Sequence, residues 1–200
     1  MAVAEAGKLV YMRELIFATG NSRKISEATA VLKRYDVKFE ACKVDIDEIQ
    51  HYDCAEITKA KARAAFAIVG QPVVVSDTSW DIPALGGFPG GYMKDIANWW
   101  QSQDWLNVMA AHEDKRIFCL EHVAYFDGTI LQHFEAKYEG RFISEARGRD
   151  DQSESFEKVV ILYGDMTMAE QLAAGEVASA GEDLTHWKLF GEWYSKRATK

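Results

Sequence analysis

Cysteine is scarce in this chain of 200 residues, which contains three: Cys42, Cys54 and Cys119. Their number is odd, they are widely spaced, and no CxxC pair occurs. The pattern therefore indicates neither a disulfide framework nor a zinc site. A reducing, cytoplasmic environment is the expectation that follows.

The sequence also lacks long apolar runs. None approaches the roughly 18–20 residues that a helix needs to span a bilayer. The segment from Met1 to Met12 carries charge and includes no apolar stretch of about 7–15 residues, so we expect no secretory signal. No membrane is predicted as a partner.

An excess of basic residues is missing as well. Lysine and arginine number 23 against 31 aspartates and glutamates, and the formal net charge at pH 7 is −8. Proteins that grip a nucleic-acid backbone usually present a basic face, whereas the basic residues here are scattered. An acidic enzyme can still bind a polyphosphate where a few cations and a metal ion are concentrated. The charge argues against a nucleic-acid polymer as a partner, but not against nucleotides.

What the sequence does contain is an alternation of short apolar runs and amphipathic segments that is typical of an α/β domain. Asp127-Gly128 is a strong turn signal that joins two strands into a hairpin. The stretch 83–91 (PALGGFPGG) is rich in breakers and predicts an irregular loop. We expect strands at 14–18, 38–44, 73–75, 116–126, 131–138, 139–143 and 159–163, and helices at 21–34, 55–69, 95–109, 168–174 and 183–198. This order predicts one α/β domain over residues 1–200 with a mixed sheet.

A glycine-containing loop between the first strand and the first helix is a candidate phosphate site. Thr19, Gly20 and Asn21 follow the strand, and Lys24 lies one turn into the helix. Gly20 lets the backbone approach an anion closely, and a helix N-terminus presents free N–H groups to it. Taken alone, however, this pattern is more often an ordinary helix N-terminus.

Two carboxylates are candidates for binding a metal ion. Glu48 ends the acidic stretch 44–48, and Asp77 lies at the end of the strand that begins at Val73. Open α/β sheets bind ligands at the carboxyl ends of their parallel strands, and Mg²⁺ needs only one or two carboxylates besides substrate phosphates. Glu48 could instead belong to a solvated acidic stretch, and Asp77 could cap a turn.

Five stretches in sequence order resemble the inosine-triphosphate pyrophosphatase family, whose members hydrolyse non-standard nucleotides. The resemblance covers residues 14–94 and includes a helix of the type E-N-A-x-x-K-A-R-A and a loop of the type A-L-x-G-x-P-G-x-Y. The matching stretches are Phe17–Lys24, Val44–Gln50, Glu56–Ala65, Val73–Thr78 and Asp81–Lys94. Chance does not readily produce five ordered matches.

The resemblance implies a fold, a reaction and a set of site residues. The fold is an elongated mixed sheet with flanking helices and two lobes around a central cleft, usually as a homodimer. The reaction is hydrolysis of a nucleoside triphosphate to the monophosphate and pyrophosphate with Mg²⁺, for which Mn²⁺ is a substitute. Glu48 would bind the metal, and Asp77 would bind metal or act as the base that prepares water. The residues implied to contact substrate in this half are Thr19, Asn21, Lys24, Lys61, Ser76, Thr78 and Lys94.

The chain departs from the family at the second acid and in its second half. Ser76 stands where the family generally has another carboxylate. Phe156 and Glu157 stand in place of the base-contacting F-G-[WY]-D-P segment, and His186 and Trp187 stand where Ser-His-Arg is expected. Trp187 removes a charged donor and adds a stacking plane or a plug, which predicts altered base specificity. Alternatively, Phe156 is a core aromatic, His186 a helix-face histidine without a ligand, and Trp187 part of a packing or dimer stripe.

Three functional hypotheses follow. The first is an active pyrophosphatase that acts on a non-standard or modified nucleoside triphosphate. The second is a degenerate, non-catalytic nucleotide-binding or interaction protein of the same fold. The third keeps hydrolysis but moves the substrate to a pyrimidine or another pyrophosphate compound. We favour catalysis, because a pure scaffold has little need for Asn21, Glu48, Asp77 and the two lysines together.

Overall fold

A mixed β-sheet forms the middle layer of the protein in the computed structural model, which describes residues 15–149, 155–175 and 183–198. The strand order is β2-β1-β3-β5-β6-β7, and β4 pairs with β3. β1, β2 and β3 are parallel, whereas β3, β5, β6 and β7 are antiparallel. The strands are β1 (Leu15–Ala18), β2 (Phe39–Cys42), β3 (Val73–Asp81), β4 (Pro89–Gly90), β5 (Arg116–Phe126), β6 (Leu131–Phe142) and β7 (Val160–Ile161). This elongated mixed sheet confirms the predicted fold class.

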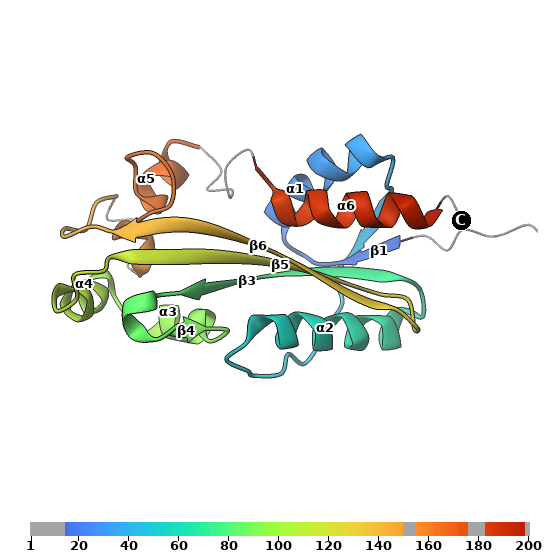
Figure 1. Ribbon diagram of the computed structural model, residues 1–200, viewed down its shortest axis with the longest axis horizontal. Helices are drawn as coiled ribbons and strands as arrows, with labels where there is room; N and C mark the ends of the chain where they lie inside the picture. Colours follow the sequence, from blue (N-terminus) through green and yellow to red (C-terminus); the bar gives the residue numbers. More distant parts are fainter. Residues whose placement is uncertain (1–14, 150–154, 176–182, 199–200) are drawn as a thin grey trace, which may run out of the picture.

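Helices cover both faces of the sheet (Figure 1). α1 and α6 lie together on one face, near β1, and α2 lies on the opposite face. α3, α4 and α5 surround the far end of the long strands. The helices are α1 (Ser22–Leu32), α2 (Cys54–Val69), α3 (Met93–Trp99), α4 (Ser102–Ala110), α5 (Met168–Ala173) and α6 (Thr185–Ala198), with short 3₁₀ turns at Lys33–Tyr35, Pro83–Leu85 and Phe156–Lys158.

Alternation along the central strands assigns each side chain to one of these two layers. Val73, Val75 and Ala124 are fully buried beneath α2, together with alanines of that helix. Val74 and Val123 are buried on the other face, in a cluster that includes α1 and α6. Because side chains of a strand point alternately to opposite faces, the β-branched run 73–75 can fill both cores at once.

The boundaries of several elements differ from those predicted. The expected helix 95–109 is two helices, since Trp100 adopts extended backbone and a capping box of Gln101 and Asp104 starts α4. The expected strands 131–138 and 139–143 are one continuous strand, β6. Asp77 does not end a strand, because β3 runs on to Asp81 through antiparallel pairing with β5. Residues 146–157, whose polar composition predicts a loop, lie partly outside the described residues.

Candidate active site

The loop from Thr19 to Lys24 is held in shape by its own side chains. Thr19 Oγ1 accepts a hydrogen bond from the Asn21 backbone N–H at 3.2 Å. Asn21 caps α1, since its side-chain oxygen accepts from the N–H groups of Arg23 at 2.9 Å and Lys24 at 3.3 Å. These bonds satisfy N–H groups that a helix leaves free at its start. A phosphate at this loop would compete with Asn21 for the same donors.

Gly20 packs closely against the side chain of Lys43. A Cβ atom on Gly20 would lie 3.2 Å from both Cγ and Cδ of Lys43, which is tighter than ordinary van der Waals contact. Lys43 follows the last residue of β2, at the same sheet edge as Thr19 after β1. Sequence reasoning missed Lys43, although its place at the carboxyl end of a strand beside β1 could have indicated it.

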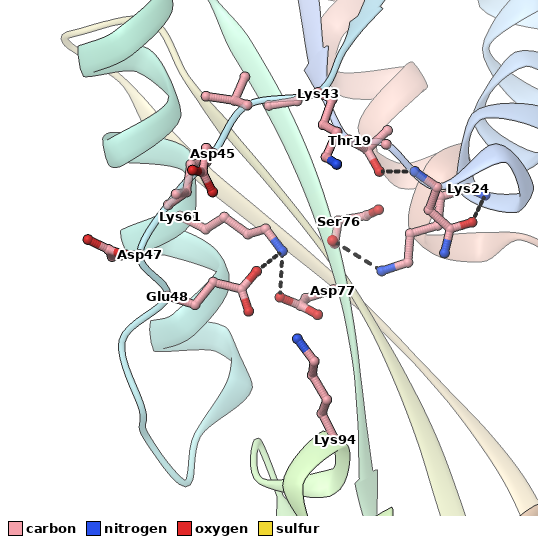
Figure 2. A pocket seen from close by; sticks show the side chains of 15 residues that line it. Thr19, Lys24, Lys43, Asp45, Asp47, Glu48, Lys61, Ser76, Asp77 and Lys94 are labelled. Carbon is pink, nitrogen blue, oxygen red and sulfur yellow. Dashed lines mark hydrogen bonds and ion pairs between the residues drawn. The ribbon is translucent and has the colours of Figure 1, made fainter. Parts of the chain in front are cut away.

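The side chain of Lys24 extends from α1 to β3, in the middle of the sheet. Its Nζ donates to the Ser76 carbonyl oxygen at 3.2 Å (Figure 2). β1 pairs with β3 only as far as Phe17 opposite Val74, so Ser76 and Asp77 lie just beyond the end of β1. Asp77 therefore lies level with the ends of the two parallel strands even though its own strand continues.

Lys61 of α2 joins the two candidate metal ligands. Its Nζ contacts Glu48 Oε1 at 2.5 Å and Asp77 Oδ2 at 3.2 Å (Figure 2). Burial lowers the pKa of Lys61, but the carboxylates of Asp77 and Glu48 outweigh this effect and raise it above its ordinary value. Lys61 is therefore a full cation here, and the two carboxylates converge on one positive charge.

A cavity of about 630 Å³ opens between these elements. Asn21 and the segment 43–48 line it together with Ser76 and Asp77. Its charged residues are four lysines and four carboxylates: Lys24, Lys43, Lys61, Lys94, Asp45, Asp47, Glu48 and Asp77. Lys94, at the start of α3, points towards Asp77 (Figure 2). The lysines can contact phosphate oxygens while the carboxylates bind a divalent cation, so the cavity has the groups that a metal-bound polyphosphate requires.

The donor set of this cavity fits Mg²⁺. Glu48 and Asp77 already converge on the single cation of Lys61, so both can reach a common charged centre. Both offer carboxylate oxygens, which are the ligands that Mg²⁺ prefers, and phosphates of a substrate would supply further oxygens. Ser76 adds no second carboxylate, and its buried Oγ has no hydrogen-bond partner. Position 76 therefore adds no carboxylate beside Glu48 and Asp77.

The glycine-rich loop 84–92 fixes the rim of the cavity by close backbone packing. The Gly91 N–H donates to the Tyr52 carbonyl oxygen at 3.0 Å. A Cβ on Gly90 would lie 2.5 Å from that oxygen, and a Cβ on Gly91 would lie 2.4 Å from the His51 carbonyl oxygen. Only glycine permits this approach. The loop therefore holds the segment that follows Glu48 and the start of α3, which carries Lys94.

A second, smaller cavity lies on the opposite face of β3. It measures about 160 Å³ and its polar lining includes Arg23, Thr78, Glu121 and Glu157. Thr78 Oγ1 donates to Glu121 Oε2 at 2.9 Å, and Glu121 is only 5% exposed. Sequence reasoning missed Glu121 and Arg23. The alternation in β5 could have shown that Glu121 lies on the same face as Val123, which is buried.

Burial raises the pKa of Glu121, despite the opposing effects of Lys24 and the Thr78 hydrogen bond. Because the pKa of this carboxyl group is higher in the folded state, its ionisation lowers the free energy of unfolding. The free energy falls as pH rises from the unfolded-state pKa of 4.5 towards the folded-state pKa. We expect Glu121→Gln to remove this loss, so the variant gains stability relative to wild type as pH rises. Urea unfolding at several pH values from 4.5 upward measures this. Glu139→Gln, an exposed position on β6, is the control, and an equal pH profile for wild type and Glu121→Gln contradicts the expectation.

The structure separates the residues expected to contact a base. Glu157 and Thr78 line the smaller cavity. Phe156 packs against Trp80 in the core, with ring centroids 4.8 Å apart, and is 5% exposed. His186 is 1% exposed, and its Nδ1 lies 3.4 Å from the Tyr138 hydroxyl. Phe156 is therefore a core aromatic, which was the alternative interpretation, and His186 is buried.

Trp187 does not provide a stacking plane for a base. It is fully buried and packs edge-on against Phe17, with ring centroids 5.0 Å apart, and against Phe190 at 6.1 Å. Trp187, which stands at the position of the family arginine, is thus part of the hydrophobic core. Other aromatic residues of α6 pack in the same core. This corrects the expectation that Trp187 contacts substrate and agrees with the packing alternative.

No described helix is both long enough and apolar enough to cross a membrane. Residues 15–176 match the Ham1 family. The chain is 29% identical over 182 residues to a dITP/XTP pyrophosphatase of Methanopyrus kandleri, covering 90% of this chain and 96% of the relative. It is 28% identical over 182 residues to an inosine triphosphate pyrophosphatase of Aspergillus oryzae, covering 90% and 93%.

Solved structures support the fold. A HAM1 protein from Coxiella burnetii superposes with a TM-score of 0.68 at 21% identity, over 94% of this chain and 99% of that one. The Ham1 protein of Staphylococcus aureus gives a TM-score of 0.69 at 17% identity, over 92% and 100%. With the family match over most of the chain, these comparisons confirm the resemblance seen in the sequence. The protein belongs to the Ham1 family.

Proposed function

We propose that this protein hydrolyses a non-standard or modified nucleoside triphosphate to the monophosphate and pyrophosphate, with Mg²⁺ as cofactor and a base preference that differs from that of its relatives. The observation that carries this proposal is the convergence of Glu48 and Asp77 on Lys61 inside a cavity that three further lysines line. The names of the relatives, dITP/XTP pyrophosphatase and inosine triphosphate pyrophosphatase, support the reaction class.

The roles of the residues follow from charge and position. Lys24, Lys61 and Lys94 would hold the triphosphate, with Thr19 and Asn21 shaping the loop that receives it. Glu48 and Asp77 would hold Mg²⁺, which when bound neutralises phosphate charge and aligns the group to be attacked. Asp77 Oδ1 accepts only the neighbouring Thr78 N–H, at 3.1 Å, among the hydrogen bonds of the described residues. It would accept the proton of the attacking water.

Altered base specificity is supported by the second cavity. Its polar lining contains Arg23 and the buried Glu121, and the family arginine is replaced by the buried Trp187. A pocket that hydrogen-bonds specific groups of its substrate rejects analogues that leave its own polar groups unpaired. We expect the preferred base to be one that can form a hydrogen bond with the carboxyl group of Glu121.

The resemblance also supports a single two-lobed domain and a homodimer. The competing proposal is a non-catalytic nucleotide-binding protein, which the missing acid at Ser76 favours. The retained Glu48, Lys61 and Asp77 favour catalysis over it. Light scattering coupled to gel filtration tests the dimer independently of the activity.

The function is tested by pyrophosphate release from a panel of ribo- and deoxyribonucleoside triphosphates, including dITP, XTP and pyrimidine nucleotides, with and without Mg²⁺. We expect Mg²⁺-dependent release with a ranking set by the base. Nucleotide binding by calorimetry without release from any member would favour the non-catalytic alternative. Preference for a pyrimidine nucleotide would change the proposed substrate class but not the proposed reaction.

We expect Lys61→Met to lower kcat/KM by roughly 10²-fold, because a cation aimed at phosphate charge that develops in the transition state is worth about 3 kcal/mol. Lys59→Met is the matched control. Lys59 lies two residues away on α2 and pairs with Glu56 at 2.8 Å instead of facing the cavity. Steady-state kinetics on the best substrate of the panel measure both. Equal losses for the two variants would show that Lys61 has no special role.

A further inference from the structure

A second cluster of ligand-type side chains lies one strand away from Asp77. In the sheet register, Asp77 of β3 pairs with His122 of β5, and His122 pairs with Glu135 of β6. His133 lies two residues before Glu135, so it points to the same face. The hairpin thus gathers two imidazoles and a carboxylate on the face that α2 partly covers.

The ligand atoms of these three residues converge. His122 Nδ1 lies 3.2 Å from His133 Nε2 and 3.5 Å from Glu135 Oε2, and all three atoms lie within 4.8 Å of one another. An imidazole nitrogen that carries one proton can donate to only one of these two neighbours. A cation at the centre would instead satisfy all three.

Both separations from His122 Nδ1 match those of a tetrahedral zinc site. Two ligand atoms bound to zinc at about 2.0–2.1 Å, at the tetrahedral angle, lie about 3.3 Å apart. The separations of 3.2 and 3.5 Å bracket this value. Imidazole nitrogen favours zinc and similar transition metals over Mg²⁺, so the cofactor of the phosphate cavity would not compete for this cluster.

The surroundings orient and favour such a site. The Nε2 of His122 contacts Ser79 Oγ at 3.0 Å, which leaves Nδ1 to face the cluster. This is the usual arrangement of a metal-bound histidine, whose other nitrogen is held by a neighbouring group. His122 is 2% exposed, whereas the Glu135 side chain is 44% exposed, which leaves a path from solvent for the ion and for a water as fourth ligand.

We infer that His122, His133 and Glu135 form a binding site for a transition-metal ion such as zinc, with Ser79 as a positioning residue. The site is separate from the phosphate cavity, because none of the four residues lines that cavity. No spacing motif in the sequence marks it, since only the register of the hairpin brings its members together.

The test is calorimetric titration of the full chain with Zn²⁺ alone, in a buffer with excess Mg²⁺ to fill the carboxylate site. We expect one equivalent of Zn²⁺ to bind, and a rise in melting temperature with it. His133→Ala and Glu135→Gln, two partly exposed positions, should each weaken binding at least about tenfold, since losing even a group that only orients a ligand costs about 10–100-fold. Visible absorption of bound Co²⁺ should show a tetrahedral spectrum that both variants lose.

Three control variants separate this site from other zinc-binding groups. His112→Ala removes a histidine after α4, Cys42→Ser removes the most exposed thiol, and Glu48→Gln alters the phosphate cavity. Each should bind Zn²⁺ as wild type does. Circular dichroism of metal-free His133→Ala and Glu135→Gln checks that both fold. Absence of Zn²⁺ binding by wild type, or equal binding by wild type and these folded variants, would overturn the inference.

Discussion

Replacement of Asp77 by asparagine is expected to lower kcat for nucleotide hydrolysis about 10³-fold, the largest effect on activity anticipated here. General-base catalysis alone contributes typically about 10²–10⁴-fold, and Asp77 is also one of two carboxylates available to the metal. Asparagine has nearly the same shape, so the contact with the Thr78 N–H can persist while the negative charge is lost. Initial rates of pyrophosphate release with saturating Mg²⁺ measure the change.

Asp81→Asn is the matched control for that measurement. Asp81 lies four residues further along β3 on the same face, where its carboxylate lies 3.9 Å from the Lys137 ammonium group. Among the contacts of the described residues it makes none with Glu48 or Lys61, so it is expected to retain wild-type turnover. Retained turnover in Asp77→Asn would contradict the proposed role of Asp77. Turnover that returned only above the Mg²⁺ concentration that saturates wild type would assign Asp77 to metal binding rather than to proton transfer.

The largest effect on stability is expected from Trp187→Ala. The side chain is fully buried between Phe17 and Phe190, so its removal leaves a cavity in the core between α6 and the sheet. Such truncations cost about 3–5 kcal/mol of the free energy of unfolding. In a chain of this size that corresponds to a fall in melting temperature of roughly 6–20 °C. Urea unfolding and thermal melts of the purified variant measure both quantities.

This substitution also discriminates between the two interpretations of Trp187. If Trp187 only packs, the variant assayed well below its melting temperature keeps the base ranking of wild type. A changed ranking with unchanged stability would mean that the side chain contacts substrate. Trp99→Ala is the control, because Trp99 on α3 is 72% exposed and its removal should change stability little.

Much of the phosphate half could be predicted from the sequence. The Thr19–Lys24 loop, Lys61 and Asp77 come from segments whose local patterns are strong, and the order of these segments carries the family resemblance. Asn21 stands at a position that is typical of a helix cap, and its side chain does cap α1. Their convergence is a consequence of parallel pairing among β1, β2 and β3, which a β/α alternation predicts.

The base-side half could not be predicted in the same way. Phe156, His186 and Trp187 belong to segments whose relation to the sheet depends on how α6 and the end of β6 pack. A buried aromatic and a base-stacking aromatic have the same signature in a sequence, so only the packing distinguishes them. Glu121 was missed for the opposite reason, since its charge suggested the surface while the alternation of β5 placed it inside.

The sequence by itself determined the α/β class, the family and the residues of the phosphate loop, because these depend on local periodicity, turn chemistry and ordered motifs. Only the tertiary structure decided which carboxylates share Lys61, why Gly90 and Gly91 are needed, that Trp187 lies in the core, and that His122, His133 and Glu135 meet. The first three depend on how helices and loops pack against the sheet, and the last depends on strand register. A shift of one residue in register would turn a strand's side chains to the opposite face, and local sequence does not encode that register.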